Sequence, residues 1–173
     1  MDVQQQLLNC PILCGCGQQH FVPIETVIVD DDVLKDITEF LREKQFHRLL
    51  LVSDANTNDV LAEEIRQQLM NAGFLADACV FSQTHDLLPD EFAIEAVRHA
   101  LDGVTVADVI LAIGSGVIND IVRYVSFEKD LPFISVATAP SMDGYASGMA
   151  AMQFHGIKVT TSARPPIAIF AEL

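Results

Sequence analysis

Two loops combine glycine, hydroxyl and carboxylate groups in patterns that could support chemistry. The first reads Gly114-Ser115-Gly116-Val117-Ile118-Asn119-Asp120, and the second reads Thr138-Ala139-Pro140-Ser141-Met142-Asp143-Gly144. Each follows an apolar stretch, and the two lie about one strand-and-helix unit apart. Bare backbone N–H groups at a helix start suit a phosphate, whereas hydroxyls and a carboxylate suit a polyol or a ribose. We interpret the loops as adjoining walls of a cleft in a nucleotide-using enzyme.

The glycine loop also has a simpler interpretation as a tight turn. It lacks the third glycine of the usual dinucleotide fingerprint, and it follows a late strand of the chain. Asn119 and Asp120 favour a ligand, because polar residues early in a helix lie near the loop. Their alternative role is to stabilise the helix dipole in its first turn.

Three further polar positions have paired interpretations. Asp54 ends an apolar strand and is a candidate for binding ribose hydroxyls, or for capping the helix that follows. If it binds ribose, it favours the cofactor without a 2′-phosphate. In the second loop, we expect Thr138 and Ser141 to contact cofactor and Asp143 to hold a substrate hydroxyl; the alternative is a polar loop of side-chain turns.

Cysteine and histidine gather near the N-terminus. Cys10, Cys14, Cys16 and His20 form a C-x3-C-x-C-G-x2-H pattern, and thiolates with imidazole are the usual zinc ligands. However, C-x-C is tighter than the common knuckle and no second knuckle follows. We therefore expect reduced structural cysteines in an N-terminal turn, with a zinc-stabilised interaction domain as the alternative.

The elements that would position these residues follow an alternating rhythm. Apolar runs predict strands at 21–30, 49–52, 76–81, 109–113, 132–137 and 167–170, with helices over 30–45, 56–71, 89–103 and 117–127. Residues 147–162 predict a β-hairpin around His155-Gly156. This order predicts an α/β fold with a parallel sheet covered by helices on both faces.

Composition narrows the function classes. The 173 residues carry 10 Lys and Arg against 24 Asp and Glu, a formal charge of −14, which disfavours nucleic acid and anionic membranes. No basic signal segment or long apolar span is evident, so we expect a cytoplasmic protein without a membrane partner. With 50% hydrophobic residues, we also expect apolar surface covered by another domain or subunit, as in a homodimer.

The motifs together resemble the bacterial-type sn-glycerol-1-phosphate dehydrogenases, in the superfamily of glycerol dehydrogenases, iron-containing alcohol dehydrogenases and dehydroquinate synthases. The resemblance extends over essentially the whole chain. It rests on Cys14-Gly15-Cys16-Gly17 through His20, the glycine loop, Tyr124-Val125-Ser126-Phe127, and the stretch from Ser135 to Ser147.

The resemblance implies a Rossmann-like nucleotide-binding domain over 1–173, with a Cys/His turn and strand in 1–25 and the hairpin and final strand in 144–173. It implies NAD- or NADP-dependent reduction of dihydroxyacetone phosphate to sn-glycerol 1-phosphate with a divalent metal, zinc or nickel, as part of phospholipid biosynthesis. The cofactor-binding positions it implies are Asp54, Gly114, Ser115, Gly116, Val117, Ile118, Asn119, Asp120, Thr138, Ala139, Pro140, Ser141 and Ser147. Asp143 falls on the substrate-binding position beside the metal, and Glu172 on a metal-binding position.

Two departures from the family pattern affect the expected activity. Glu172 stands where the family usually has Asp, and the helical C-terminal domain that supplies two histidine ligands is absent from this sequence. A catalytic zinc normally needs about three protein ligands. We therefore expect weak nucleotide binding without turnover by this polypeptide, and the alternative is a non-catalytic nucleotide-binding or assembly module derived from the family.

Overall fold

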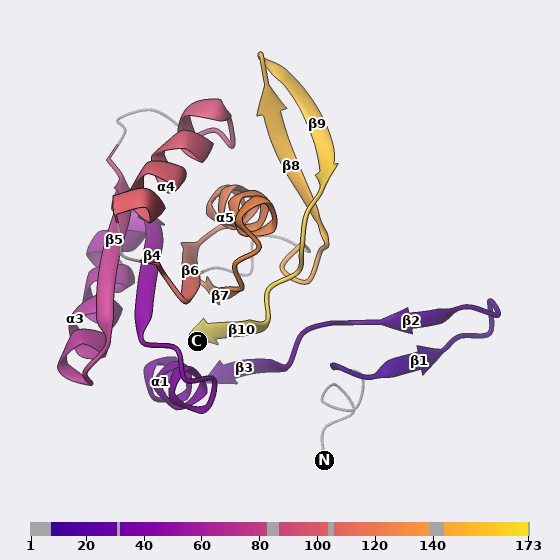
Figure 1. Ribbon diagram of the computed structural model, residues 1–173, viewed down its shortest axis with the longest axis horizontal. Helices are drawn as coiled ribbons and strands as arrows, with labels where there is room; N and C mark the ends of the chain where they lie inside the picture. The colour runs from indigo at the N-terminus through magenta and orange to yellow at the C-terminus, as the bar shows by residue number, and fades with distance from the viewer. Residues whose placement is uncertain (1–7, 31, 83–86, 104–105, 139–143, 173) are drawn as a thin grey trace.

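A six-stranded parallel sheet forms the centre of the molecule. The computed structural model describes residues 8–30, 32–82, 87–103, 106–138 and 144–172, and Figure 1 shows the arrangement of their elements. The strands lie in the order β3 (Thr26–Asp30), β10 (Ala168–Glu172), β7 (Phe133–Ala137), β6 (Val109–Gly114), β4 (Arg48–Asp54) and β5 (Leu75–Phe81). Every neighbouring pair is parallel.

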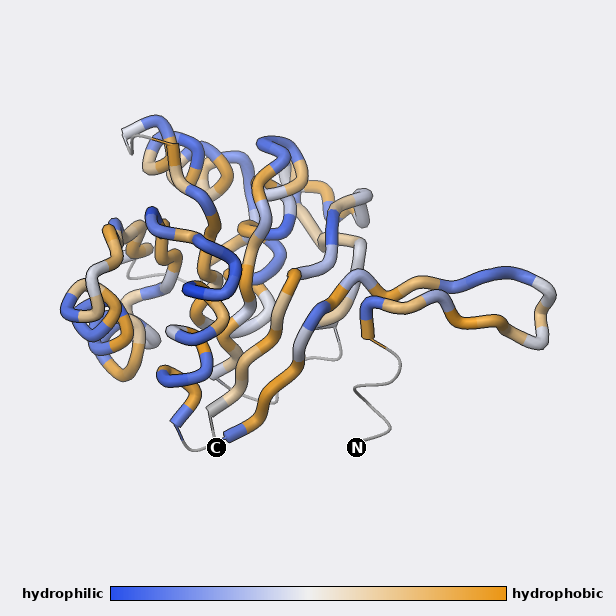
Figure 2. The backbone as a smooth tube through the Cα atoms, turned by 60° about the horizontal axis from the view of Figure 1, so that its bottom comes forward, coloured by the Kyte–Doolittle hydropathy of each residue, from blue (hydrophilic) through white to orange (hydrophobic). Residues whose placement is uncertain are grey.

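Helices cover both faces of this sheet. One face packs against α1 (Val33–Glu43) and α3 (Glu63–Asn71), and the other against α4 (Glu91–Gly103) and α5 (Gly116–Lys129). Because both faces are covered, every residue of the central strands β6 and β7 is buried. In Figure 2, the strands of the body are largely hydrophobic, and hydrophobic and hydrophilic stretches alternate along the surrounding helices. The predicted α/β fold is confirmed.

The sheet order changes direction between β4 and β6. The chain runs from β4 outward to the edge strand β5, then returns to β6 on the other side of β4 and continues to β7. The helices that follow β4 and β6 therefore leave the sheet on opposite faces. In open α/β sheets, ligands bind in the crevice outside the carboxyl ends of strands at such a point.

Two hairpins extend from the body (Figure 1). The predicted one consists of β8 (Met149–Phe154) and β9 (Ile157–Ser162). His155 and Gly156 both have positive φ, 51° and 80°, as a two-residue hairpin turn requires. The other, β1 (Pro11–Leu13) with β2 (Gln19–Phe21), was not predicted from the sequence.

Two helix starts differ from the sequence interpretation. The helix expected over 56–71 begins as α2 (Ala55–Thr57), widens into the π-helical segment η1 (Asn58–Ala62) and continues as α3. The helix expected over 30–45 begins later, at Val33, as α1; Asp32 occupies its N-cap position, and the Asp32 side chain makes no capping hydrogen bond. Among the described residues, no helix is long and apolar enough to cross a bilayer.

Candidate functional site

The strand register brings the predicted site residues to one edge of the sheet. We call this row, formed by Asp54, Gly114, Ala137 and Ala171, the carboxyl edge. The residue pairs that align the carboxyl edge across neighbouring strands are Val52 with Ala112, Gly114 with Ala137, and Ala137 with Ala171. The ends of β6 and β7 are therefore adjacent, as the two polar loops had predicted.

The glycine loop joins β6 to α5 at the centre of the carboxyl edge. Gly114 has φ +149°, a conformation that L side chains rarely adopt, and a Cβ there would lie 3.1 Å from Ile118 Cγ1. Ser115 is the extended N-cap of α5, and its side chain makes no capping hydrogen bond. The N–H groups of the first helical turn have no acceptor within the helix. They are therefore suited to bind an anion at this point.

Asn119 lies beneath this loop rather than facing outward. Its side chain is buried, and Nδ2 donates to the carbonyl oxygens of Gly114 at 3.2 Å and Ser115 at 3.1 Å. The hydroxyl of Ser135, on β7, donates to Asn119 Oδ1 at 2.6 Å. Asn119 thus fixes the loop conformation and ties it to the neighbouring strand, a role for which Ser135 was not singled out from the sequence.

Asp54 caps the helix that follows it, which is one of the two roles predicted for this residue. Its Oδ1 accepts a hydrogen bond from the backbone N–H of Thr57 at 2.9 Å, and Thr57 Oγ1 lies 3.2 Å from the backbone N of Asp54. This reciprocal pair is a capping box. Thr57 Oγ1 also lies 3.3 Å from the carbonyl oxygen of Ile113. One hydroxyl therefore links α2, which follows β4, to the end of β6 across the point where the sheet order changes direction.

Asp120 is half-buried and pairs with Arg123, a residue that the sequence analysis did not select. Arg123 is 1% exposed, and its Nη1 lies 2.5 Å from Asp120 Oδ1. Its Nη2 donates to the carbonyl oxygens of Gly144 at 2.7 Å and Tyr145 at 3.3 Å. Burial raises the pKa of the Asp120 carboxyl, and the positive charge of Arg123 opposes that shift. The spacing of three residues on one helix was the available signal for this pair.

The second loop is described only at its flanks. Thr138 is half-buried immediately after β7, and Ser147 Oγ forms a local turn, accepting from the backbone N–H of Met149 at 3.0 Å. By register, the backbone of Glu172 lies beside that of Asp30, one position beyond the carboxyl edge. The predicted residues Ala139, Pro140, Ser141 and Asp143 lie outside the described residues.

A cleft of about 460 Å³ opens beside the start of α5. Val117 and Asp120 line it from the helix, and Lys158 lines it from β9. Lys158 is thus placed near the glycine loop, where a basic side chain favours an anionic ligand. Arg164, which follows β9, pairs with Asp130.

The described part of the carboxyl edge does not assemble a metal site. Within the described residues, three His, Cys, Asp or Glu side chains converge only at Cys14, Cys16 and His20. These belong to the β1–β2 hairpin, which projects away from the sheet in Figures 1 and 2.

Known proteins resemble this chain in sequence and in fold. One relative is a glycerol-1-phosphate dehydrogenase [NAD(P)+] from Geobacillus stearothermophilus, which is 36% identical over 96% of this chain and 42% of its own length. Another, with the same name, is from Bacillus subtilis (strain 168) and is 33% identical over 88% of this chain and 39% of its own length. The chain thus spans about two fifths of these curated relatives.

The solved structures that match are more distant in sequence and indicate the fold alone. Glycerol dehydrogenase from Schizosaccharomyces pombe superposes with a TM-score of 0.72 at 18% identity, covering 86% of this chain and 37% of that one. Sulfoacetaldehyde reductase from Bifidobacterium kashiwanohense, solved in complex with NAD+, gives 0.71 at 14% identity, covering 87% and 44%. The family model described as iron-containing alcohol dehydrogenase matches residues 28–173. The chain belongs to the iron-containing alcohol dehydrogenase family.

Proposed function

We propose that this chain is the cofactor-binding part of an oxidoreductase that uses NAD or NADP to reduce dihydroxyacetone phosphate to sn-glycerol 1-phosphate. The observation that carries the proposal is the start of α5 at the carboxyl edge. There, a glycine with φ +149° and an uncapped helix N-terminus follow a fully buried strand at the point where the sheet order changes direction. The names of the curated relatives support the choice of substrate and cofactor.

In this proposal, backbone N–H groups of residues 115–118 hold the cofactor diphosphate. The positive end of the helix dipole stabilises its charge. Asn119 acts through the loop, because its amide is already bonded to two loop carbonyls. The nicotinamide supplies the hydride when it is bound, and the protein supplies position and charge.

Asp54 is proposed to accept hydrogen bonds from the cofactor ribose while it caps α2. A carboxylate has about four lone-pair sites, and the described capping bond from Thr57 uses Oδ1. Thr138, Ser141 and Ser147 are proposed to contact the cofactor from the second loop. Asp143 is proposed to bind the substrate hydroxyl.

The resemblance further supports a divalent metal with Glu172 among its ligands; Asp143 and the side chain of Glu172 lie outside the described residues. We also propose, from the resemblance, that the 173-residue chain binds NADH without oxidising it when dihydroxyacetone phosphate is added. Loss of NADH absorbance on adding that substrate would contradict this expectation.

Calorimetric titration with NADH tests the cofactor assignment. The variant is Gly116→Val, at the first residue of α5, and its control is Gly103→Val, at the last residue of α4. A Cβ at Gly103 meets nothing within 4 Å. We expect binding by the native chain and by the control but not by Gly116→Val, since a branched side chain blocks approach of phosphate to the backbone. Equal binding by all three would remove the assignment.

A further inference from the structure

The tip of the β1–β2 hairpin gathers two thiols and an imidazole that the proposed dehydrogenase function does not use. The candidate ligand atoms of Cys14, Cys16 and His20 lie within 4.8 Å of one another, and Cys16 Sγ lies 3.2 Å from His20 Nε2. These three residues, which we call the tip cluster, come from the turn and from β2. All three are exposed.

The turn geometry produces this convergence. The N–H of Gly17 donates to the carbonyl oxygen of Cys14 at 3.0 Å, and the N–H of Cys14 donates to that of Gln18 at 3.2 Å. Gly17 has φ +80°, a conformation that L side chains rarely adopt. Gly17 therefore permits a tight reversal of the chain that carries both thiols at its tip.

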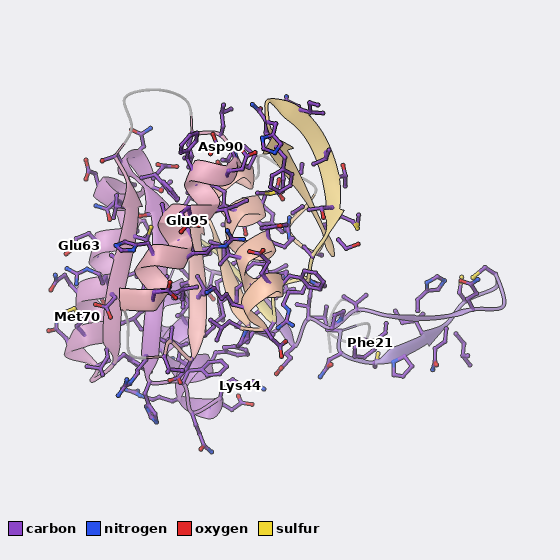
Figure 3. The ribbon with its side chains drawn as sticks, turned by 45° about the horizontal axis from the view of Figure 1, so that its top comes forward. Phe21, Lys44, Glu63, Met70, Asp90 and Glu95 are labelled. Carbon is purple, nitrogen blue, oxygen red and sulfur yellow. The ribbon has the colours of Figure 1, made fainter. Side chains whose placement is uncertain are left out.

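The hairpin lacks the packing that ordinarily stabilises such an element. Its strands are three residues each, and the side chains of Leu13 and Phe21 are 90% and 53% exposed. Figure 3 shows the hairpin projecting from the body, with Phe21 near its base. An isolated two-stranded hairpin is marginally stable in water. Free cysteine is among the residues most often buried, so two exposed thiols at this tip need an explanation other than packing.

A zinc ion fits the dimensions and the chemistry of the tip cluster. Tetrahedral bonds of about 2.3 Å to sulfur and 2.0–2.1 Å to nitrogen separate the ligand atoms by roughly 3.6–3.8 Å. The observed limit of 4.8 Å and the contact of 3.2 Å bracket this spacing. Residues 8–22 contain no charged side chain. Two thiolates would therefore balance the charge of a divalent ion without interference from neighbouring groups.

We propose that Cys14, Cys16 and His20 bind one Zn²⁺ ion that cross-links the hairpin tip, with water in the fourth position. The structure thus favours the zinc alternative over the reduced structural cysteines expected from the spacing. The ion joins the turn to β2 and replaces the hydrophobic core that this hairpin lacks. Its stabilisation of the hairpin is part of its binding free energy, because the ligands converge only in the folded turn.

Cobalt substitution tests this proposal on the full chain with its thiols kept reduced. Co²⁺ bound to cysteine gives thiolate-to-metal charge-transfer absorption, whereas a family metal held by oxygen and nitrogen ligands does not. The result expected is a charge-transfer band that saturates at one Co²⁺ per chain and disappears on adding excess Zn²⁺. Failure of NADH binding would leave this result unchanged, so the two proposals can fail separately.

Variants identify the ligands. Cys14→Ser and Cys16→Ser should each reduce the charge-transfer intensity and lower metal affinity by tenfold or more, and His20→Ala should lower affinity while retaining the band. Cys79→Ser is the matched control, because Cys79 is a half-buried thiol in β5. Absence of the band, its persistence in both tip serine variants, or an equal loss in Cys79→Ser would overturn the proposal. So would thiol analysis showing Cys14 and Cys16 joined to each other by a disulfide in freshly purified protein.

Discussion

Replacing Arg123 by methionine should destabilise the fold and disturb the segment that follows the second loop. Arg123 is 1% exposed. Besides its ion pair with Asp120, it donates to the carbonyl oxygens of Met149, Gly144 and Tyr145. Methionine matches the length of the arginine stem but offers no donor. The substitution therefore removes the described link from α5 to residues 144–149 and leaves the Asp120 carboxylate without its cation.

The expected cost follows from this geometry. Removing one partner of a buried ion pair lowers the free energy of unfolding by about 3–5 kcal/mol. At about 2–4 °C per kcal/mol for a chain of this size, Tm should fall by roughly 6–20 °C. Urea denaturation followed by far-UV circular dichroism measures the free energy, and the slope with denaturant checks that the unfolded surface is unchanged.

A second substitution and a pH series separate the loss of charge pairing from a general loss of packing. Asp120→Asn added to Arg123→Met should restore at least about 1 kcal/mol, because no carboxylate then remains unpaired. Burial already raises the pKa of Asp120, and removing Arg123 takes away the largest opposing cause, which is the positive charge of that side chain. The folded state then binds the proton more tightly than the unfolded state, so the stability of Arg123→Met should increase as pH falls through the folded pKa. A loss below about 1 kcal/mol, or no rescue by Asp120→Asn, would refute the reasoning.

Three further substitutions test other parts of the account. Asn119→Leu should lower the free energy of unfolding by about 2–4 kcal/mol in urea denaturation, because it leaves loop carbonyls and the Ser135 hydroxyl unsatisfied; a loss shared equally by a surface Asn→Leu control would contradict this. Asp54→Asn keeps a good N-cap but removes the charge that repels a 2′-phosphate, so calorimetry should show NADPH binding strengthened relative to NADH, and an unchanged ratio would argue against the ribose role. Hydrogen bonds from Arg66 hold the pKa of the Glu63 carboxyl at about 2, so its stabilising contribution, present above its ordinary pKa, should disappear as pH falls toward 2. Arg66→Met should return that pKa toward its ordinary value in an NMR titration, and no movement would exclude this cause.

The ion pair of Glu63 and Arg66 lies on the outer surface of α3. Arg66 Nε donates to Glu63 Oε2 at 2.8 Å, and Arg66 Nη1 lies 3.1 Å from Met70 Sδ. Figure 3 shows Glu63 and Met70 on this helix, at the side of the molecule away from the β1–β2 hairpin. Changes at Arg66 therefore leave the carboxyl edge untouched and serve as a stability reference for the variants at the site.

The sheet could be predicted because its signals are local and strong. Residues 109–113 are apolar throughout, residues 133–137 are apolar apart from Ser135, and both strands are buried on two faces. Alternation with helices then determines the parallel arrangement. The hairpin of β8 and β9 was predicted around His155-Gly156, and the positive φ of both residues is that of a two-residue hairpin turn. The first main strand was placed too early, at Phe21, whereas β3 begins at Thr26, after Pro23.

The unpredicted features depend on contacts between distant segments. The strands β1 and β2 are too short to show a period, and their side chains are mostly exposed. In the sequence, Arg123 resembles a surface cation. It can be buried because Asp120 and the carbonyl groups of residues 144–149 accept its hydrogen bonds. The inward orientation of Asn119 likewise depends on Ser135, on another strand. Sequence patterns identified the loops, whereas the residues that hold them in place required the tertiary structure.

A crystal structure of the chain with bound NAD+ tests the central claim most directly. The account predicts diphosphate oxygens about 2.7–3.2 Å from backbone nitrogens at the start of α5, where residues 115–118 begin the helix. The adenosine ribose should then lie beside Asp54. Density for the diphosphate at any other part of the molecule, or first-turn amides of α5 bonded to protein groups instead, would contradict it.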